Sequence, residues 1–182
     1  MNPLYNHSYT EAEFEEIQKK FDGKAEYDNG YIFLSSNTSI RHNEIKSNIL
    51  ANLTLFLRVS NCKAYDEQIE VIFKNDQETY KYKPDVFIMR KDATRSGESF
   101  TSSPKIIFEV ISKSTASHDY ITKLAVYQKF GVLEYNLVEQ NGHIIQYVLE
   151  DGAYFIKDTF KGDDTYISSF FPKLKINLKD IF

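Results

Sequence analysis

Two short apolar runs, each carrying one carboxylate, stand out in the pattern of hydrophobic and polar positions. The run Val-Phe-Ile-Met at 86–89 follows Asp85 directly. Side chains alternate between the two faces of a strand, and within the stretch 105–112 positions 106–111 are apolar on both faces except at Glu109. A strand that is apolar on both faces is typical of the interior of a sheet. The pattern therefore predicts two buried strands, each with an acid.

Helical spacing occurs in two stretches before these strands. The capping-box pair Thr10 and Glu13 predicts a helix over about residues 11–20. From residue 40 to about 59 an apolar side chain recurs at every fourth position, which predicts the longest amphipathic helix of the chain, with Ser39 as its N-cap. We place His42, near its start, on a different face from the first residue of the stripe, Ile45.

A third helix is predicted over about residues 118–130, with Ser117 as N-cap and Gly131 as its C-terminal stop. Three polar residues spaced by four share one of its faces: Asp119, Lys123 and Tyr127. The candidates for packing are Ile121, Leu124 and Ala125. Considered alone, Asp119 and Lys123 form an exposed pair that contributes a few tenths of a kcal/mol, about 0.2–0.5.

Turn residues divide the rest of the chain into strands. Asp28-Asn29-Gly30 predicts a hairpin between 24–27 and 31–34, and Asn141-Gly142 and Asp151-Gly152 predict two more hairpins. Further strands are expected in three segments: 62–65, 68–73 and 79–82. Together these elements predict one α/β domain over residues 1–182, with a mixed central sheet flanked by helices.

Composition narrows the class of protein. The net charge of −4 gives no global basic field, so charge alone does not predict nucleic-acid binding. Around the polar loop 91–103 there is a local basic excess that either attracts phosphates or is a solvated surface, since Asp85, Asp92 and Glu98 are outnumbered by Lys81, Lys83, Arg90, Lys91 and Arg95. The single cysteine, Cys62, excludes an internal disulfide and a cysteine-based zinc site. Because no apolar stretch approaches roughly 18 residues and no leader pattern is present, we expect a cytoplasmic protein that does not enter the membrane.

The two buried acids carry the candidate chemistry. Burying an unpaired carboxylate costs several kcal/mol or more, so Asp85 and Glu109 suggest a shared cation; the alternative is that both lie at wet strand ends. Two oxygen ligands suit Mg²⁺ or Mn²⁺, and Lys123 on the next helix could stabilise charge on a phosphate. Metal-assisted phosphodiester hydrolysis fits this set. On physics alone, Glu26 is an ordinary exposed strand residue.

The order of these residues resembles the PD-(D/E)xK nuclease superfamily and, more closely, its Uma-type restriction endonuclease family. The resemblance covers nearly the whole chain and rests on Glu26, Gly30, His42, Pro84-Asp85-Val86, Glu109-Val110-Ile111-Ser112, Ser114-Thr115, Asp119, Lys123, Tyr127, Gly131-Val132 and Glu134-Tyr135. It implies a restriction endonuclease-like fold. The sequence departs from the family pattern at Lys113, Asn136 and Glu139.

The resemblance also implies a role for each matching residue. The metal ligands would be Asp85, Glu109, Glu26 and the backbone carbonyl of Val110. Because Ile111 stands where the usual lysine would follow Glu109, Lys123 takes over as the catalytic lysine. Substrate contacts would come from His42, Lys83 and Lys113, with Asp119 and Tyr127 in support.

We therefore expect an endonuclease that depends on Mg²⁺ or Mn²⁺ and hydrolyses the phosphodiester bonds of DNA. One alternative is a catalytically silent nucleic-acid-binding or regulatory module on the same fold. Another is a structural interaction protein whose acids are salt-bridged to Lys123. Duplex cleavage would favour a homodimer that presents two sites.

Overall fold

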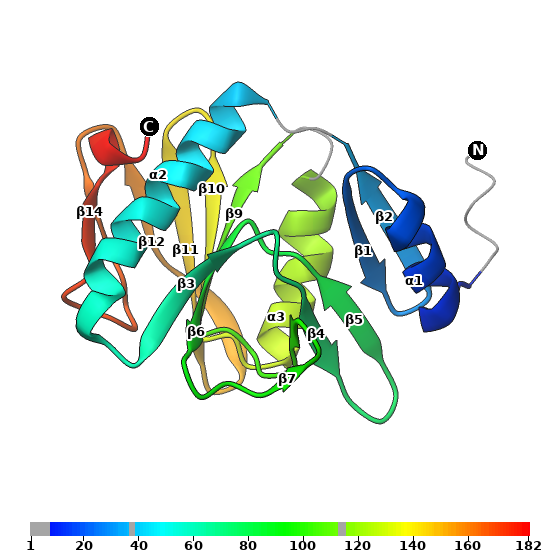
Figure 1. The fold of residues 1–182 in the computed structure, drawn as a ribbon. Helices are drawn as coiled ribbons and strands as arrows, with labels where there is room; N and C mark the ends of the chain where they lie inside the picture. The colour runs from blue at the N-terminus through cyan, green and yellow to red at the C-terminus, as the bar shows by residue number, and fades with distance from the viewer. Residues whose placement is uncertain (1–7, 37–38, 113–115) are drawn as a thin grey trace.

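Two six-stranded sheets form the frame of the protein in the computed structural model, which describes residues 8–36, 39–112 and 116–182. The central sheet has the order β12-β11-β10-β9-β6-β3 and is mixed, because β9 and β10 run parallel while the other neighbours run antiparallel (Figure 1). Its strands are β3 (Cys62–Asp66), β6 (Val86–Arg90), β9 (Ile106–Ile111), β10 (Glu134–Glu139), β11 (His143–Glu150) and β12 (Ala153–Lys161). The α/β class with a mixed central sheet is confirmed.

The N-terminal hairpin belongs to a second sheet, whereas the sequence predicted a single one. The order of this sheet is β2-β1-β5-β4-β8-β7. Its strands are β1 (Lys24–Asp28), β2 (Tyr31–Ser35), β4 (Val71–Lys74), β5 (Thr79–Tyr82), β7 (Arg95–Ser96) and β8 (Ser99–Phe100). The chain passes from this sheet to the central one more than once; one passage lies between β5 and β6, where Pro84 interrupts the strand because proline has no N–H for the ladder.

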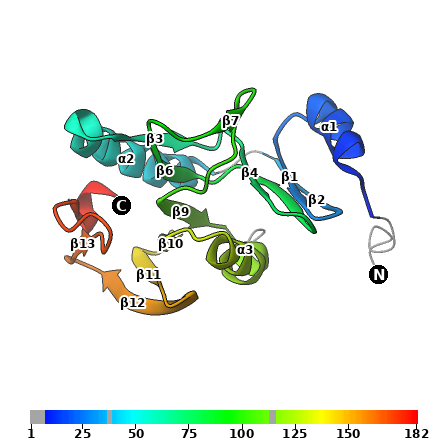
Figure 2. The same cartoon turned by 90° about the horizontal axis from the view of Figure 1, so that it is seen from below.

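Helices separate and cover the sheets. The helix α2 (Ile40–Phe56) lies on one face of the central sheet, and α3 (Leu124–Lys129) lies on the other face, towards the second sheet (Figure 2). The helix α1 (Glu11–Lys20) packs Phe14 against Ala25 and Tyr27 on the outer side of the second sheet. A small sheet of β13 (Thr165–Ile167) and β14 (Lys175–Asn177) follows near the C-terminus.

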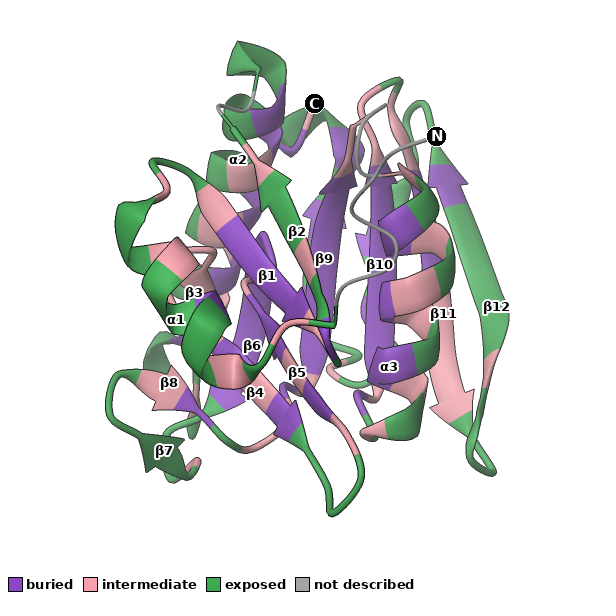
Figure 3. Cartoon of the chain, turned by 90° about the vertical axis from the view of Figure 1, so that its right-hand side faces the viewer, coloured by how far each residue is buried: buried purple, intermediate pink, exposed green. Residues whose placement is uncertain are grey.

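Two apolar cores lie on the opposite faces of the central sheet. The buried stripe of α2, extended by Leu57 just after the helix, packs with Ile106, Phe108 and Val110 of β9; its members in the helix are Ile45, Ile49 and Leu53. The opposite face of β9 contributes Ile107 to a core that includes Phe87 and Tyr127 and reaches Phe73 and Tyr82 of the second sheet. Figure 3 shows β9 and β10 as buried strands between the two layers. The predicted division of β9 into two buried faces is confirmed.

Turn chemistry explains why the hairpins form where the sequence predicted them. Asn29 and Gly30 both have positive φ, 43° and 103°, and Asp151 and Gly152 have 50° and 81°. Two consecutive positive φ angles match the twist of the flanking strands in a tight hairpin, and asparagine, aspartate and glycine tolerate them best. The capping box of Thr10 and Glu13 is also present at the start of α1.

Two predictions about helix faces are wrong. His42 is buried on the same side of α2 as Ile45, because residues three apart on a helix are neighbours. In the third helical segment, Ser117 is itself helical and makes no side-chain cap, and residues His118–Lys123 form a π-helical turn before α3. Ile121 points outwards, 70% exposed, while the polar face is turned inwards.

None of the helices in the described part of the chain is long and apolar enough to cross a membrane.

Candidate active site

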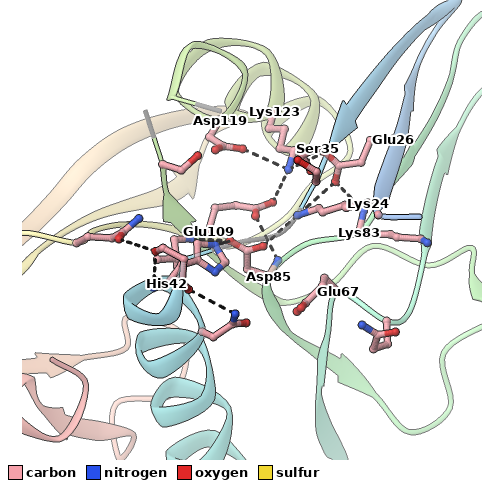
Figure 4. Close-up of a pocket in the computed structure, with 18 of the residues that line it drawn as sticks. Lys24, Glu26, Ser35, His42, Glu67, Lys83, Asp85, Glu109, Asp119 and Lys123 are labelled. Atoms are coloured by element: carbon pink, nitrogen blue, oxygen red, sulfur yellow. Dashed lines mark hydrogen bonds and ion pairs between the residues drawn. The ribbon is translucent and has the colours of Figure 1, made fainter. Parts of the chain in front are cut away.

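A pocket of about 750 Å³ opens where the two sheets meet, and it contains most of the predicted site (Figure 4). The predicted residues that line it are Glu26, His42, Lys83, Asp85, Glu109, Val110, Asp119 and Lys123. They come from both sheets, from the first turn of α2 and from the π-helical turn. Residues that lie up to about a hundred positions apart in the sequence therefore meet at one place.

Asp85 lies in the linker between the sheets and is held by three groups. Its Oδ2 accepts hydrogen bonds from the Val110 backbone N–H (2.9 Å) and lies 3.1 Å from His42 Nε2. Its Oδ1 lies 3.0 Å from the Lys24 ammonium. Burial alone would raise the pKa of Asp85, but Lys24 and the His42 hydrogen bond hold this pKa well below its ordinary range. The group is thus a carboxylate at neutral pH.

Glu109 lies beside Asp85 on β9 and is 1% exposed. Its Oε1 accepts hydrogen bonds from the Lys123 ammonium (3.0 Å) and the Tyr127 hydroxyl (2.9 Å), and its Oε2 accepts one from the Asp85 backbone N–H (3.2 Å). Burial raises the pKa of Glu109 to about 7, against the opposing effect of Lys123. The two acids are thus linked directly, and neither lies at a wet strand end.

Lys123 connects three acids and is 2% exposed. Its Nζ lies 3.0 Å from Glu109 Oε1, 3.1 Å from Glu26 Oε2 and 3.2 Å from Asp119 Oδ1. Burial lowers the pKa of Lys123, but Glu109 and Glu26 outweigh burial and raise it well above its ordinary value. The expectation of an exposed pair with Asp119 is wrong. A π-helical turn widens the helix locally, and such turns are frequent at functional sites.

Glu26 is buried in the same cluster, so the interpretation of it as an ordinary exposed residue is also wrong. Its Oε1 accepts a hydrogen bond from the Lys83 backbone N–H at 2.8 Å. Burial raises the pKa of Glu26, but Lys123 and Lys24 lower it more. Lys24 was missed by sequence reasoning, although it precedes Glu26 by two residues and must share a face of β1 with it.

The remaining predicted residues differ in their placement. His42 contacts Asp85 with Nε2, and Tyr127 contacts Glu109, so both adjoin the acids. Lys83 lines the pocket, whereas Lys113 lies outside the described residues.

Two of the basic residues near loop 91–103 are paired with acids. Lys81 is paired with Glu11 and Glu15, while Arg90 pairs with Asp92.

The chemistry of the donor set, though not its present arrangement, suits a hard divalent cation. Four buried carboxylates share two ammonium groups, those of Lys24 and Lys123; the acids are Glu26, Asp85, Glu109 and Asp119. Oxygen donors with excess negative charge suit Mg²⁺ or Mn²⁺. Within the described ranges, however, no three His, Cys, Asp or Glu side chains are arranged to hold a metal. The ammonium groups lie between the acids instead.

Comparison with known proteins gives one family and one fold. Residues 11–179 match the family Uma2, described as "putative restriction endonuclease". A solved structure from Anabaena variabilis, described as "a putative nuclease belonging to DUF820", is similar with a TM-score of 0.72 and 17% identity, over 92% of this chain and 96% of that one. At this identity the likeness shows the fold. No curated protein matches the sequence.

Proposed function

The chain belongs to the Uma2 family, and from that premise we propose that it is a Mg²⁺- or Mn²⁺-dependent endonuclease that hydrolyses phosphodiester bonds of DNA. The observation that carries the proposal is that two buried acids adjoin in one pocket: the Asp85 backbone N–H donates to the Glu109 carboxylate, and the Lys123 ammonium donates to the other oxygen of Glu109. Buried acids arranged in this way with a lysine are rarely needed for stability alone, because desolvation offsets much of what such ion pairs contribute.

The metal would be held by oxygen atoms of Asp85, Glu109 and Glu26 and by the backbone carbonyl of Val110. When bound, it would supply Lewis-acid stabilisation of the phosphate and lower the pKa of an attacking water. Val110 adjoins this set, because its N–H donates to Asp85 at the point where the pairing of β6 with β9 has ended.

The other side chains would orient the acids and meet the charge of the substrate. Lys123 places a buried ammonium beside Glu109, where negative charge that develops on a phosphate would be stabilised strongly because water is excluded. Asp119 holds Lys123 from the preceding turn, and Tyr127 fixes Glu109 through its hydroxyl. His42 fixes the orientation of Asp85. These contacts would preorganise the acids before a substrate enters.

Cleavage of supercoiled plasmid, measured with Mg²⁺, Mn²⁺ or EDTA, tests this proposal. Asp85→Asn removes a charge but keeps the shape of the side chain, and Asp92→Asn makes the same change at an exposed ion pair beyond the other end of β6. We expect cleavage with either metal, none with EDTA, a loss of at least about 100-fold in Asp85→Asn and wild-type activity in Asp92→Asn. Equal activity in wild type and Asp85→Asn, or activity in EDTA, would refute the proposal.

A silent nucleic-acid-binding module remains the second candidate, because Lys24 and Lys123 already neutralise part of the acid cluster without metal. The same preparation distinguishes the two candidates. DNA binding without cleavage, together with no Mn²⁺ binding in calorimetry, would favour the silent module. A parallel arm with single-stranded RNA of the same sequence tests whether DNA is the substrate.

A further inference from the structure

Lys24 is the residue of the acid cluster that no role yet explains. It begins β1, and its side chain reaches between Glu26 and Asp85, as Figure 4 shows. Its ammonium lies 3.0 Å from Asp85 Oδ1 and 3.8 Å from Glu26 Oε1. These are two of the carboxylates proposed above as metal ligands. Lys24 thus holds a place that a metal ion would need.

The two oxygens of Asp85 differ in how firmly they are occupied. Oδ2 lies against His42 Nε2 and the Val110 backbone N–H, both of which belong to the framework of the fold. Oδ1 is contacted by Lys24, whose ammonium ends a flexible four-carbon stem. A cation that approaches Asp85 can therefore reach Oδ1 by moving one side chain, without disturbing a strand or a helix.

Lys24 is also held less firmly than Lys123. The side chain of Lys24 is 20% exposed and has one close and one long ion pair. Lys123 is 2% exposed, makes three contacts of 3.0–3.2 Å, and lies over the ring of Tyr82. Exposure lowers the strength of an ion pair because water competes for both partners. Of the two ammonium groups, that of Lys24 is the one that gives way more easily.

We propose that Lys24 is an exchangeable counter-ion: it occupies Asp85 Oδ1 in the metal-free protein, and a divalent cation displaces it. The displaced ammonium remains tethered at the pocket wall, where it is available to a phosphate oxygen of the substrate. This inference rests on the proposed metal site. The exchange explains why the acids form a compact cluster without metal. The positive charge of Lys24 offsets the repulsion between the carboxylates.

Mn²⁺ titration calorimetry without nucleic acid tests the exchange. The variant is Lys24→Met, which keeps a flexible, unbranched side chain only one atom shorter and removes its charge. Lys83→Met is the matched control, because Lys83 lines the same pocket and loses the same charge. We expect Lys24→Met to bind Mn²⁺ at least tenfold more tightly than wild type and clearly more tightly than Lys83→Met. Its melting temperature should fall without metal and recover with Mn²⁺.

Lys24→Arg separates competition from folding, because it keeps the charge and should bind Mn²⁺ no more tightly than wild type. If wild type binds Mn²⁺ but Lys24→Met gains no more affinity than Lys83→Met, the proposed exchange is refuted. The proposed metal site is then still supported, because wild type binds the ion. If neither wild type nor Lys24→Met binds Mn²⁺, both proposals fail. Mn²⁺ binding by Lys24→Met but not by wild type would support the exchange, because Lys24 would then exclude the ion completely.

Discussion

Replacing Lys123 by methionine removes the ammonium that connects Glu26, Glu109 and Asp119 and leaves three buried carboxylates facing one another. Removing one partner of a buried ion pair costs roughly 3–5 kcal/mol, because the remaining charge is neither solvated nor paired. For a chain of this length, 1 kcal/mol corresponds to roughly 2–4 °C in melting temperature, so we expect a fall of about 6–20 °C.

The assay is urea denaturation followed by circular dichroism in EDTA, with melting curves alongside. Lys129→Met is the control, because Lys129 is 49% exposed and pairs with Glu78 at the surface, where such a pair contributes about 0–1 kcal/mol. The double variant Lys123→Met with Glu109→Gln should recover part of the loss, since it also removes one of the repelling charges.

The reasoning is refuted if Lys123→Met lies within about 1 kcal/mol of wild type, or loses no more than Lys129→Met. The experiment also sets a condition on activity measurements. Loss of cleavage in a Lys123 variant is informative only at a temperature at which circular dichroism shows that variant to be folded.

Two further predictions concern Glu109. The pKa of Glu109 is about 7 in the folded protein and near 4.5 in the unfolded chain, so between these values the folded state holds a proton that the unfolded state has released. The free energy of unfolding in EDTA should therefore fall as pH rises from about 5 to 8. Glu109→Gln should lack this part of the fall. Urea midpoints at each pH measure it, and identical profiles would contradict it. At about pH 9, above the Glu109 pKa of about 7, Tyr127→Phe should cost roughly 1.5–3 kcal/mol, since the hydroxyl then donates to a charged acceptor. Tyr135→Phe, whose hydroxyl donates to the carbonyl of Asp119, should cost about 0.5–1.5 kcal/mol. Equal losses in urea denaturation would argue against an ionised Glu109.

Much of the fold could be predicted because its signals are local. The Asp28-Asn29-Gly30 turn and the Thr10–Glu13 capping box involve residues within three positions of one another. The apolar faces of β9 are likewise a property of one strand. The division into two sheets could not be predicted, because it depends on which strands pair across the chain.

The site residues likewise differ in whether a local sequence signal marks them. Asp85 and Glu109 were found because an acid inside an apolar run is visible in the sequence. Lys24 was missed because its partner, Asp85, is 61 positions away and nothing near Lys24 marks it. Ile121 was expected to pack, yet it is exposed, because the polar face of its helix fills the pocket instead.

The burial of polar residues in β10 is a further feature that the sequence does not reveal. The strand's alternation of apolar and polar side chains is typical of a half-exposed strand, but Glu134 and Asn136 are fully buried. Glu134 accepts hydrogen bonds from Ser168 at 2.8 Å, from Gln146 at 3.0 Å, and from Tyr166. These donors come from later strands and loops, which local periodicity does not reveal.

The passage of the chain between the two sheets at Pro84 has a consequence for how the protein acquires a working site. Lys24 and Glu26 belong to one sheet, while Glu109 belongs to the other, and Asp85 lies in the linker between them. Neither sheet alone holds all of the acids. The contact between Lys123 and Glu26 closes a loop of about a hundred residues. The proposed site therefore forms only after the two sheets have docked, and a partly unfolded chain would not present it to a substrate.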